Sequence, residues 1–440
     1  MKNKFWVIAA AGCFLSLGGL VAPLQAQHEE PVNVLLITVD SLRPDHLGCY
    51  GYPKNISPNI DKLAKEGVIF TQAIAQASWT LPSIVSIATS TYPSAHKVNF
   101  WGIILSPKLP TIAEILRRRG YHNFLCSGHS NPLFEIGGFQ RGFDDWTKNV
   151  KALTGNEVSG QALRFLKENY KNKFFLWVHY MDTHDHFFKP QRNNPDPLDV
   201  SQKQANIVKY DNAIKQVDQQ IGIMVDELNK LGIGNNTLII ITADHGEEIC
   251  EHGRCFAHAG SLWDPLIRVP LIMVWGKQFP GGLKRNSQVQ HIDIAPTICD
   301  VLKIKKPALF KGQSLLPIIQ KEAGTLRAAF SEYHKRTGAI RTGEWLYSMY
   351  SVRMDSWKLI YTDYAKDPAE YALYNLKADP EELKNLNEFE TLRKNEEAKF
   401  RLLRLELETW SKRKKPQIKP VSKQLDKQTK ERLKSLGYLH

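Results

Sequence analysis

Four short apolar runs constrain the fold of this chain more than any other feature. They are NVLLITVD (33–40), FFLWVHYMD (174–182), TLIIITADHG (237–246) and PLIMVWG (270–276). Runs of this length without polar alternation are typical of strands buried on both faces of a parallel or mixed sheet. Between the second and third runs, residues 211–232 repeat apolar side chains at helical spacing, which predicts an amphipathic helix. Strands that alternate with helices indicate an α/β fold class.

Three of the four runs end in an aspartate, namely Asp40, Asp182 and Asp244. Open α/β sheets bind their ligands outside the carboxyl ends of the strands, so these side chains are candidates for one site. Four histidines lie close to them in the sequence: His179, His184, His186 and His245. An isolated aspartate at such a position is more often the cap of the next turn or helix. Three of them, one followed directly by a histidine, favour a metal site.

The mixture of oxygen and nitrogen ligands indicates which divalent metal the site would hold. Asp40, Asp244 and His245, with one hydroxyl, suit Zn²⁺ or Mn²⁺ better than Ca²⁺, which prefers six or more oxygen ligands. Ca²⁺ remains the alternative. The following stretch, EHGRCFAHAGS, adds His252 and His258 on a loop near the same strand end. We expect one of these two to bind substrate or to protonate a leaving group.

Thr80, in the segment SWTLPS, has two interpretations. The segment predicts a helix that begins around Thr80, with Pro82 tolerated in its first turn. Thr80 could simply cap a buried helix. It could also be a nucleophile, because free N–H groups and the helix dipole would attract an anion there, and a metal would help to ionise the hydroxyl. Composition and spacing do not separate the two.

The first 26 residues predict a secretory signal peptide. Lys2 and Lys4 precede an apolar stretch, and Ala26 supplies a small residue for cleavage. We therefore expect a secreted or periplasmic protein, with an uncleaved membrane anchor as the alternative. Five cysteines follow this segment, an odd and sparse set that argues against a disulfide framework. Cys250 and Cys255 are close enough in sequence to pair locally, a question that the sequence leaves open.

Length and charge bound the organisation and the partners. At 440 residues, the chain exceeds the roughly 250–300 at which single cores stop growing, which predicts one large domain and one smaller one. The net charge of +13 is concentrated in residues 411–440, where ten Lys and Arg face only Asp426 and Glu431. For an exported protein this tail predicts at most a weak contact with an anionic surface, and no nucleic-acid partner.

At the level of motifs, the chain resembles the sulfatase family of the alkaline phosphatase superfamily. The resemblance runs through ITVDSLRPDHLGCYGY, SWTLPSIVSIATSTYPSAHKV, GFQRGFDDW, HYMDTHDHF, TLIIITADHGEE and HAGSLWDPLIRVPLIMVWG. It continues through HIDIAPTICDVL and KGQSLLPII to YSVRMDSWKLIY and ALYNLKADPEELKNL. It implies an α/β sandwich with a central, mostly parallel mixed sheet, and a smaller C-terminal antiparallel sheet with a helix. The corresponding boundaries are 30–320 for the catalytic domain, 325–395 for the C-terminal subdomain and 396–440 for a helix and basic tail.

The resemblance also implies roles for single residues. Asp40, Asp244 and His245 would bind the metal together with Thr80, which stands at the nucleophile position. His184 would contact the transferring group, and His258 would be a second catalytic acid or base. SGHSN places His129 and Asn131 at positions for substrate binding, without the lysine that the family usually carries there.

The departures from the family pattern concern the reaction. The usual Cys or Ser, which is converted to formylglycine, is replaced by Thr80, and the arginine of that motif by Ile84. A formylglycine hydrate releases sulfate by eliminating from its second hydroxyl, which threonine lacks. A phosphorylated threonine can instead be resolved by in-line attack of water or an alcohol. Ser41 replaces the second aspartate of the first motif.

These observations predict a metal-dependent hydrolase of sulfate- or phosphate-type esters, acting on a small-molecule, glycan or lipid substrate. One alternative is a phosphoethanolamine- or glycerol-phosphate-type transferase, although such relatives usually carry several membrane helices before the catalytic domain. The other is a non-catalytic protein that binds sulfated or phosphorylated glycans, which the lost arginine and lysine would suit. The metal-binding positions argue against that alternative.

Overall fold

The computed structural model describes most of the chain. The described residues are 33–129, 137–148, 152–184, 203–321, 327–337, 344–388, 394–412, 421–422, 427 and 430–431. The predicted signal segment, Asn131, His186 and most of the basic tail therefore lie outside the described residues.

An eight-stranded sheet forms the centre of the molecule, in the order β11-β2-β10-β7-β1-β6-β4-β5. Its strands are β1 (Asn33–Val39), β2 (Val68–Ile74), β4 (His122–Ser127), β5 (Asp145–Trp146), β6 (Phe174–Tyr180), β7 (Thr237–Ala243), β10 (Arg268–Val274) and β11 (Leu283–Gln290). All neighbouring pairs are parallel except those of β10, which runs antiparallel to both β7 and β2. The expectation of a mixed, mostly parallel sheet is confirmed.

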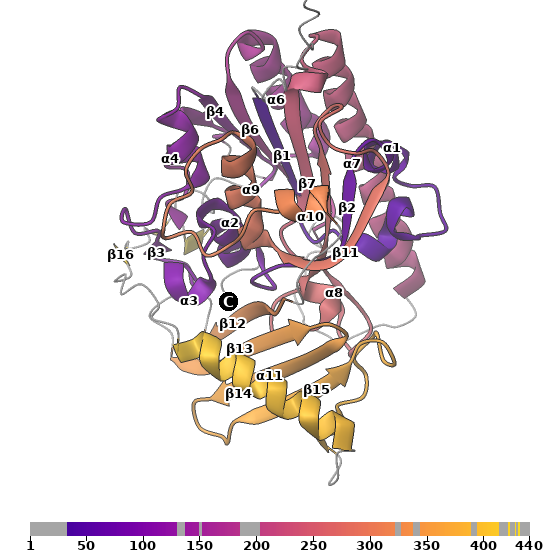
Figure 1. Cartoon of the computed structure of the whole chain (residues 1–440), viewed down its shortest axis with the longest axis vertical. Helices are drawn as coiled ribbons and strands as arrows, with labels where there is room; N and C mark the ends of the chain where they lie inside the picture. Colours follow the sequence, from indigo (N-terminus) through magenta and orange to yellow (C-terminus); the bar gives the residue numbers. More distant parts are fainter. Residues whose placement is uncertain are drawn as a thin grey trace, which may run out of the picture.

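The three central strands explain the continuous apolar runs of the sequence. Every residue of β1, β6 and β7 is buried, because helices cover the sheet and each of these strands has neighbours on both sides. One group of helices comprises α1 (Pro58–Glu66), α6 (Gly155–Asn169) and α7 (Lys203–Lys230), of which α7 contacts both others. A second comprises α2 (Thr80–Thr89), α4 (Ile112–Arg117) and α9 (Ile294–Val301). Figure 1 shows α2 and α9 in front of the sheet.

Short elements connect these layers, several of them near the carboxyl ends of the central strands. The helical ones are α3 (Pro93–His96), α8 (Asp264–Ile267) and α10 (Leu316–Gln320). The short strands are β3 (Ile103–Ile104), β8 (Glu248–Ile249), β9 (Cys255–Ala257) and β16 (Val421–Ser422). β8 pairs with β9, and β16 returns from the C-terminal end to pair with β3.

A separate antiparallel sheet forms the C-terminal subdomain, as predicted. It consists of β12 (Ala329–Arg336), β13 (Trp345–Met354), β14 (Trp357–Tyr364) and β15 (Glu370–Asn375). Helix α11 (Lys394–Lys412) crosses this sheet, and Trp410 stacks on Phe330 with ring centroids 4.8 Å apart. Figure 1 shows this unit in orange and yellow below the large sheet, with β12 nearest to it.

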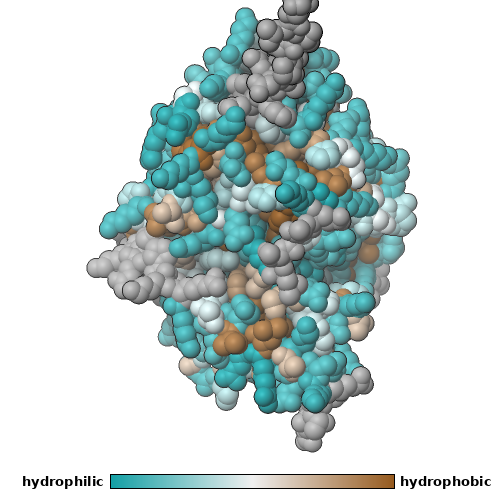
Figure 2. Space-filling view, viewed as in Figure 1, coloured by the Kyte–Doolittle hydropathy of each residue, from teal (hydrophilic) through white to brown (hydrophobic). Residues whose placement is uncertain are grey.

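The surface in view is largely hydrophilic. Figure 2 shows polar residues over most of this face, with apolar patches between them, one of them over the lower part of the molecule. Within the described ranges, no helix is both long and apolar enough to cross a membrane.

Candidate active site

Sheet order brings the predicted ligand positions together. β1 lies between β6 and β7, with Thr38 opposite His179 and Val39 opposite Ala243. Asp40 and Asp244 directly follow Val39 and Ala243, so they leave adjacent parallel strands at the same level. The backbone N–H of Asp40 extends the ladder by donating to the carbonyl of Tyr180 over 2.8 Å.

Ser41 links the two aspartates. Its hydroxyl donates to Asp40 Oδ1 over 2.9 Å, and its backbone N–H donates to Asp244 Oδ1 over 3.2 Å. The left-handed backbone of Ser41, with φ at 56°, turns the chain sharply at the strand end and is uncommon for a residue other than glycine. Ser41 therefore does not supply the second carboxylate of the usual motif, but it orients the two that remain.

Both aspartates are fully buried, and their charges affect each other. Burial and the charge of Asp40 raise the pKa of Asp244 to about 7. Burial acts in the same direction on Asp40, but His184, together with His179 and His245, holds the pKa of Asp40 well below its usual range. Within the described part of the chain, Asp244 Oδ2 accepts no hydrogen bond. Two buried carboxylates whose ligand oxygens lie within 4.8 Å of each other favour a positive ligand between them.

His179 belongs to this site, although the sequence did not single it out as a ligand. It is fully buried, and its Nε2 lies 3.7 Å from Asp40 Oδ2. Its Nδ1 lies 2.9 Å from Thr38 Oγ1, which also accepts a hydrogen bond from the indole of Trp177. An Nδ1–H that donates to Thr38 leaves the Nε2 lone pair directed at the aspartates, as in histidines that bind metals. The signal for this role was a histidine inside an otherwise apolar buried strand.

His245 faces the same point from the other side. Its Nδ1 lies 2.8 Å from the carbonyl of Gly246, to which it donates, so its Nε2 carries a lone pair. That Nε2 lies 3.3 Å from Thr80 Oγ1 and 3.4 Å from Asp244 Oδ2. Burial, reinforced by His258, lowers the pKa of His245 to about 4, so the ring is neutral at physiological pH. We refer to Asp40, His179, Asp244 and His245 as the strand-end cluster.

Thr80 is the first residue of α2, as the sequence predicted. Its side chain is 1% exposed, and its Oγ1 donates to Asp40 Oδ2 over 3.2 Å. A helix-capping hydroxyl would instead accept from a backbone N–H of the first turn, and the helix has no such side-chain cap. Thr80 therefore points into the strand-end cluster, and the capping interpretation is wrong.

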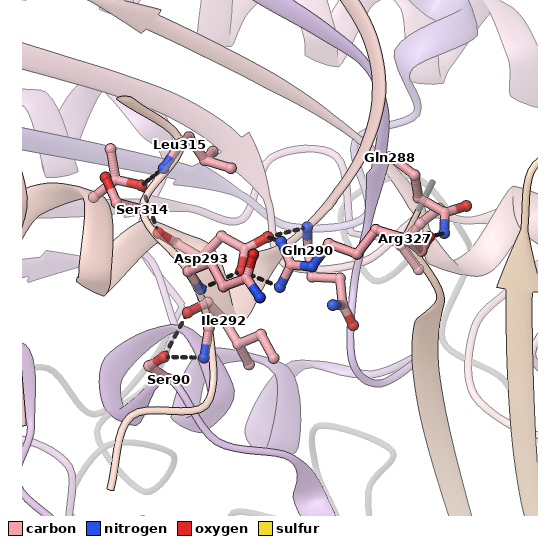
Figure 3. A network of polar contacts seen from close by, with 12 residues as sticks. Ser90, Gln288, Gln290, Ile292, Asp293, Ser314, Leu315 and Arg327 are labelled. Atoms are coloured by element: carbon pink, nitrogen blue, oxygen red, sulfur yellow. Dashed lines mark hydrogen bonds and ion pairs between the residues drawn. The ribbon is translucent and has the colours of Figure 1, made fainter. Parts of the chain in front are cut away.

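The helix that carries Thr80 is held at both ends. Near its start, Ser83 donates to the carbonyl of Asp244. At its end, Ser90 donates to the carbonyl of Ile292, in the network that Figure 3 shows. The same network contains Asp293, which forms a two-pronged ion pair with Arg327 at 2.8 and 2.9 Å, just before β12. These contacts fix α2 between the large sheet and the C-terminal subdomain.

Two further histidines line the site. The ring of His258 lies 4.8 Å from that of His184 and 4.7 Å from that of His245, measured between centroids. Nδ1 of His258 lies 3.3 Å from a carboxylate oxygen of Glu247, a fully buried acid that the sequence did not identify. Glu247 orients the His258 ring as a carboxylate orients a catalytic histidine. Both predicted catalytic histidines are thus beside the strand-end cluster.

Other predicted or neighbouring residues lie elsewhere. Asp182 accepts a hydrogen bond from the N–H of Gly155, the first residue of α6, whose N-cap is Thr154, and among the described residues it lies outside the group that could hold a metal. The ring of His252 stacks on that of Trp263, with centroids 3.7 Å apart, and its Nδ1 lies 3.4 Å from Glu248 Oε1. His129 is buried two residues beyond β4, where its N–H donates to Ser127. Its predicted role in substrate binding stays a prediction.

The donor set of the strand-end cluster fits a divalent metal. One ligand atom each from Asp40, His179 and Asp244 lies within 4.8 Å of the others, and all three residues are buried. His245 Nε2 and Thr80 Oγ1 lie next to them.

The loop between Asp244 and His258 contains a disulfide. Cys250 and Cys255 are joined across the β8–β9 hairpin, which answers the question that the sequence left open. The described cysteines outside it are Cys49, Cys126 and Cys299, all free thiols.

Comparison with known proteins identifies the family of this chain. The Sulfatase family profile matches residues 32–304, and the profile of the N-sulphoglucosamine sulphohydrolase C-terminal domain matches residues 251–408. An ulvan-active sulfatase from Formosa agariphila is 24% identical over 433 residues, covering 85% of this chain and 81% of the relative.

Two solved structures illustrate the range of the fold. One, solved in complex with its substrate D-glucosamine-2-N,6-O-disulfate, has a TM-score of 0.70 at 19% identity and covers 89% of this chain and 100% of its own. The other, a phosphonate monoester hydrolase of Agrobacterium radiobacter, has a TM-score of 0.68 at 22% identity with the same coverage. The family match, which spans more than half of the chain, and the site that it contains lead to one conclusion: this protein belongs to the sulfatase family of ester hydrolases.

Proposed function

We propose that this protein is an exported, metal-dependent hydrolase of sulfate- or phosphate-type esters in which Thr80 is the nucleophile. The observation that carries the proposal is the position of Thr80 Oγ1, 3.2 Å from Asp40 Oδ2 and 3.3 Å from His245 Nε2 at the start of a buried helix. A hydroxyl in this position points into the strand-end cluster, where a metal cation would balance the charges of Asp40 and Asp244.

The strand-end cluster and Thr80 would hold the metal. When bound, a divalent ion would neutralise the aspartates, polarise the ester and favour the ionised form of the threonine hydroxyl. The protein's contribution is geometric: Ser41 and the Thr38–His179 contact orient the ligands before a substrate arrives.

In the first step, Thr80 Oγ1 gives up its proton to solvent water and attacks the phosphorus or sulfur of the ester. A bond forms from Oγ1 to that centre, and the bond to the alcohol oxygen breaks. His258, oriented by Glu247, donates a proton to the departing oxygen. Water then attacks the covalent adduct, with the deprotonated His258 as base, and Thr80 is regenerated.

The single hydroxyl of Thr80 favours phosphate-type esters over sulfate esters. A threonine adduct has no second hydroxyl from which to eliminate, so the transferred group must leave by attack at its own centre, which phosphoryl groups undergo readily. That the fold also occurs in a phosphonate monoester hydrolase supports this preference. The sulfated sugar substrate of another structural neighbour supports a glycan as the alcohol part.

The disulfide between Cys250 and Cys255 supports export, because such bonds persist in oxidising compartments. The signal-like segment of residues 1–26 supports the same destination.

The test is hydrolysis by the mature protein, with Mn²⁺ or Zn²⁺, of aryl phosphates, aryl phosphodiesters and aryl sulfates. We expect turnover of at least one class, and a loss of at least about a thousandfold in kcat for Thr80→Ala. Thr80→Ser, which keeps the hydroxyl, should retain part of the activity. No turnover of any class would contradict the proposal, as would an unaffected kcat in Thr80→Ala with its metal bound.

A further inference from the structure

The loop that carries His258 is held at both ends by one residue of the C-terminal subdomain. Glu382 follows β15, and its backbone carbonyl lies 3.3 Å from Nε2 of His252. Its carboxylate accepts a hydrogen bond from the N–H of Asp264, the first residue of α8. His252 also stacks on Trp263, which brings the two ends of the loop together. Glu382 thereby closes the segment that contains His258.

A buried lysine side chain lies between the carboxylates of Asp264 and Glu382. Nζ of Lys358, on β14, lies 2.9 Å from Asp264 Oδ1 and 2.8 Å from Glu382 Oε1. Lys358 is 0% exposed, which lysine tolerates only when it is paired. Nε of Arg353, on β13, lies 3.2 Å from Asp264 Oδ2. We call Asp264, Glu382, Lys358 and Arg353 the clamp cluster; it joins the small sheet to the large domain.

The loop leads directly to the reacting groups. The N–H of Ala259, next to His258, donates over 2.8 Å to the carbonyl of Ser78, two residues before Thr80. Arg254 donates to the carbonyls of His258 and Ala259 from within the loop. A displacement of the loop would therefore move His258 relative to both Thr80 and the strand-end cluster.

We propose that Glu382 and Lys358 are positioning residues for the active site, which hold the loop of residues 252–264 so that His258 stays beside Thr80. This inference rests on the proposed catalytic role of His258. It assigns the C-terminal subdomain a part in the reaction, exerted through the loop and without contact with the substrate. Misplacement of a catalytic group by about 1 Å can cost up to a hundredfold in rate.

Two variants of the full chain test the proposal. Glu382→Gln keeps the shape of the side chain and removes its charge. The double variant Lys358→Met with Glu382→Gln removes both charges of the pair, which keeps the interior free of an unpaired ion if the single variant folds poorly. Arg404→Met is the matched control, because it breaks an exposed ion pair with Glu408 on α11 of the same subdomain.

Three quantities are measured: kcat and KM on the best ester, Mn²⁺ affinity, and hydrogen exchange of the amides in 252–263. We expect faster exchange in that segment and a fall in kcat of about tenfold in both test variants. KM and Mn²⁺ affinity should not change in either test variant. The control Arg404→Met should keep the wild-type kcat, KM, Mn²⁺ affinity and exchange rates. An undiminished kcat in both variants would overturn the proposal, and so would a parallel loss of Mn²⁺ affinity, which indicates general destabilisation.

The exchange measurement separates this inference from the proposed function. If the wild type hydrolyses no ester, the proposed function fails, and with it the catalytic part of the inference. Faster exchange in 252–263 would still show that Glu382 holds the loop, whereas unchanged exchange would overturn the clamp itself.

Discussion

The strand-end cluster and the clamp cluster are both buried groups of charged residues, but they differ in how charge is balanced. In the strand-end cluster two aspartates face His245, whose low pKa leaves its ring neutral, and Asp244 Oδ2 has no hydrogen-bond partner within the described residues. In the clamp cluster two acids face Lys358 and Arg353 at ion-pair distance. The clamp cluster thus contains its own lysine and arginine, whereas the ion pairs of the described residues give the two strand-end aspartates only histidine partners.

An aspartate carboxyl group therefore has a different pKa in each of the two clusters. Burial acts to raise the pKa of Asp264, but Arg353 and Lys358 lower it to about 2. Burial and Asp40 raise the pKa of Asp244 to about 7. Burial also raises the pKa of Glu382 to about 7, so the clamp is fully ionised only above neutral pH. The comparison indicates that one cluster serves the folded chain and the other serves a ligand.

Removal of a charge should have opposite effects on stability in the two clusters, and the larger effect is expected in the clamp. Lys358→Met leaves two acids with Arg353 alone, and we expect it to lower the free energy of unfolding by roughly 3–5 kcal/mol. Denaturant unfolding at pH 8 measures this. Arg404→Met, on an exposed pair, should cost less than about 1 kcal/mol. If Lys358→Met and Arg404→Met lowered the free energy of unfolding equally, the clamp would be no more important for stability than an exposed ion pair, which would contradict the account.

Asp244→Asn should instead stabilise the metal-free protein, by roughly 1–3 kcal/mol at pH 8, because it removes one of two like charges. The size of this gain depends on pH. A carboxyl whose pKa rises from 3.8 to about 7 on folding is protonated in both states at low pH, and its cost develops as pH rises and is complete above 7. The gain should therefore fade towards pH 4.

Metal binding should act against this difference in stability between the wild type and Asp244→Asn, and it provides the control. Unfolding in EDTA and in Mn²⁺ should show that the wild type gains stability from the ion whereas Asp244→Asn does not. A variant that is less stable without metal, or one that is stabilised by Mn²⁺ as much as the wild type, would contradict the assignment of Asp244.

The smallest expected effect is the pH dependence of metal binding. Because Asp244 must lose its proton to bind, Mn²⁺ affinity should fall about tenfold for each pH unit below 7. His245, with a pKa of about 4, is already neutral and adds little to this slope above pH 5. Titration calorimetry in buffers of different ionisation heat measures the released proton directly. Binding that is independent of pH between 5 and 7 would contradict the raised pKa.

Much of this arrangement could be predicted from the sequence, since strand ends and helix starts leave local signals. The apolar runs that stop at Asp40 and Asp244 identified two ligands, and SWTLPS located Thr80 at the start of a helix. The sequence did not show that β1 lies between β6 and β7, so the place of His179 beside Asp40 could not be derived.

The direction in which side chains point was the second property that the sequence did not predict. Asp182 ends an apolar run as Asp40 and Asp244 do, yet its carboxylate turns to the N-terminus of α6. Glu382 lies more than 100 residues from the loop that it closes, and only the docking of the small sheet brings them together. Contacts of that kind depend on the packing of whole subdomains and leave no local pattern.

The central claim is that Thr80 forms the covalent bond to the substrate. Intact-protein and peptide mass spectrometry after brief, acid-quenched exposure of the metal-loaded enzyme to an aryl phosphate or aryl sulfate tests it most directly. The account predicts a mass increase of one phosphoryl or sulfuryl group, distinguished by accurate mass, on the peptide that contains Thr80. Such an adduct on another residue, or turnover of the ester by Thr80→Ala at the rate of the wild type, would contradict it.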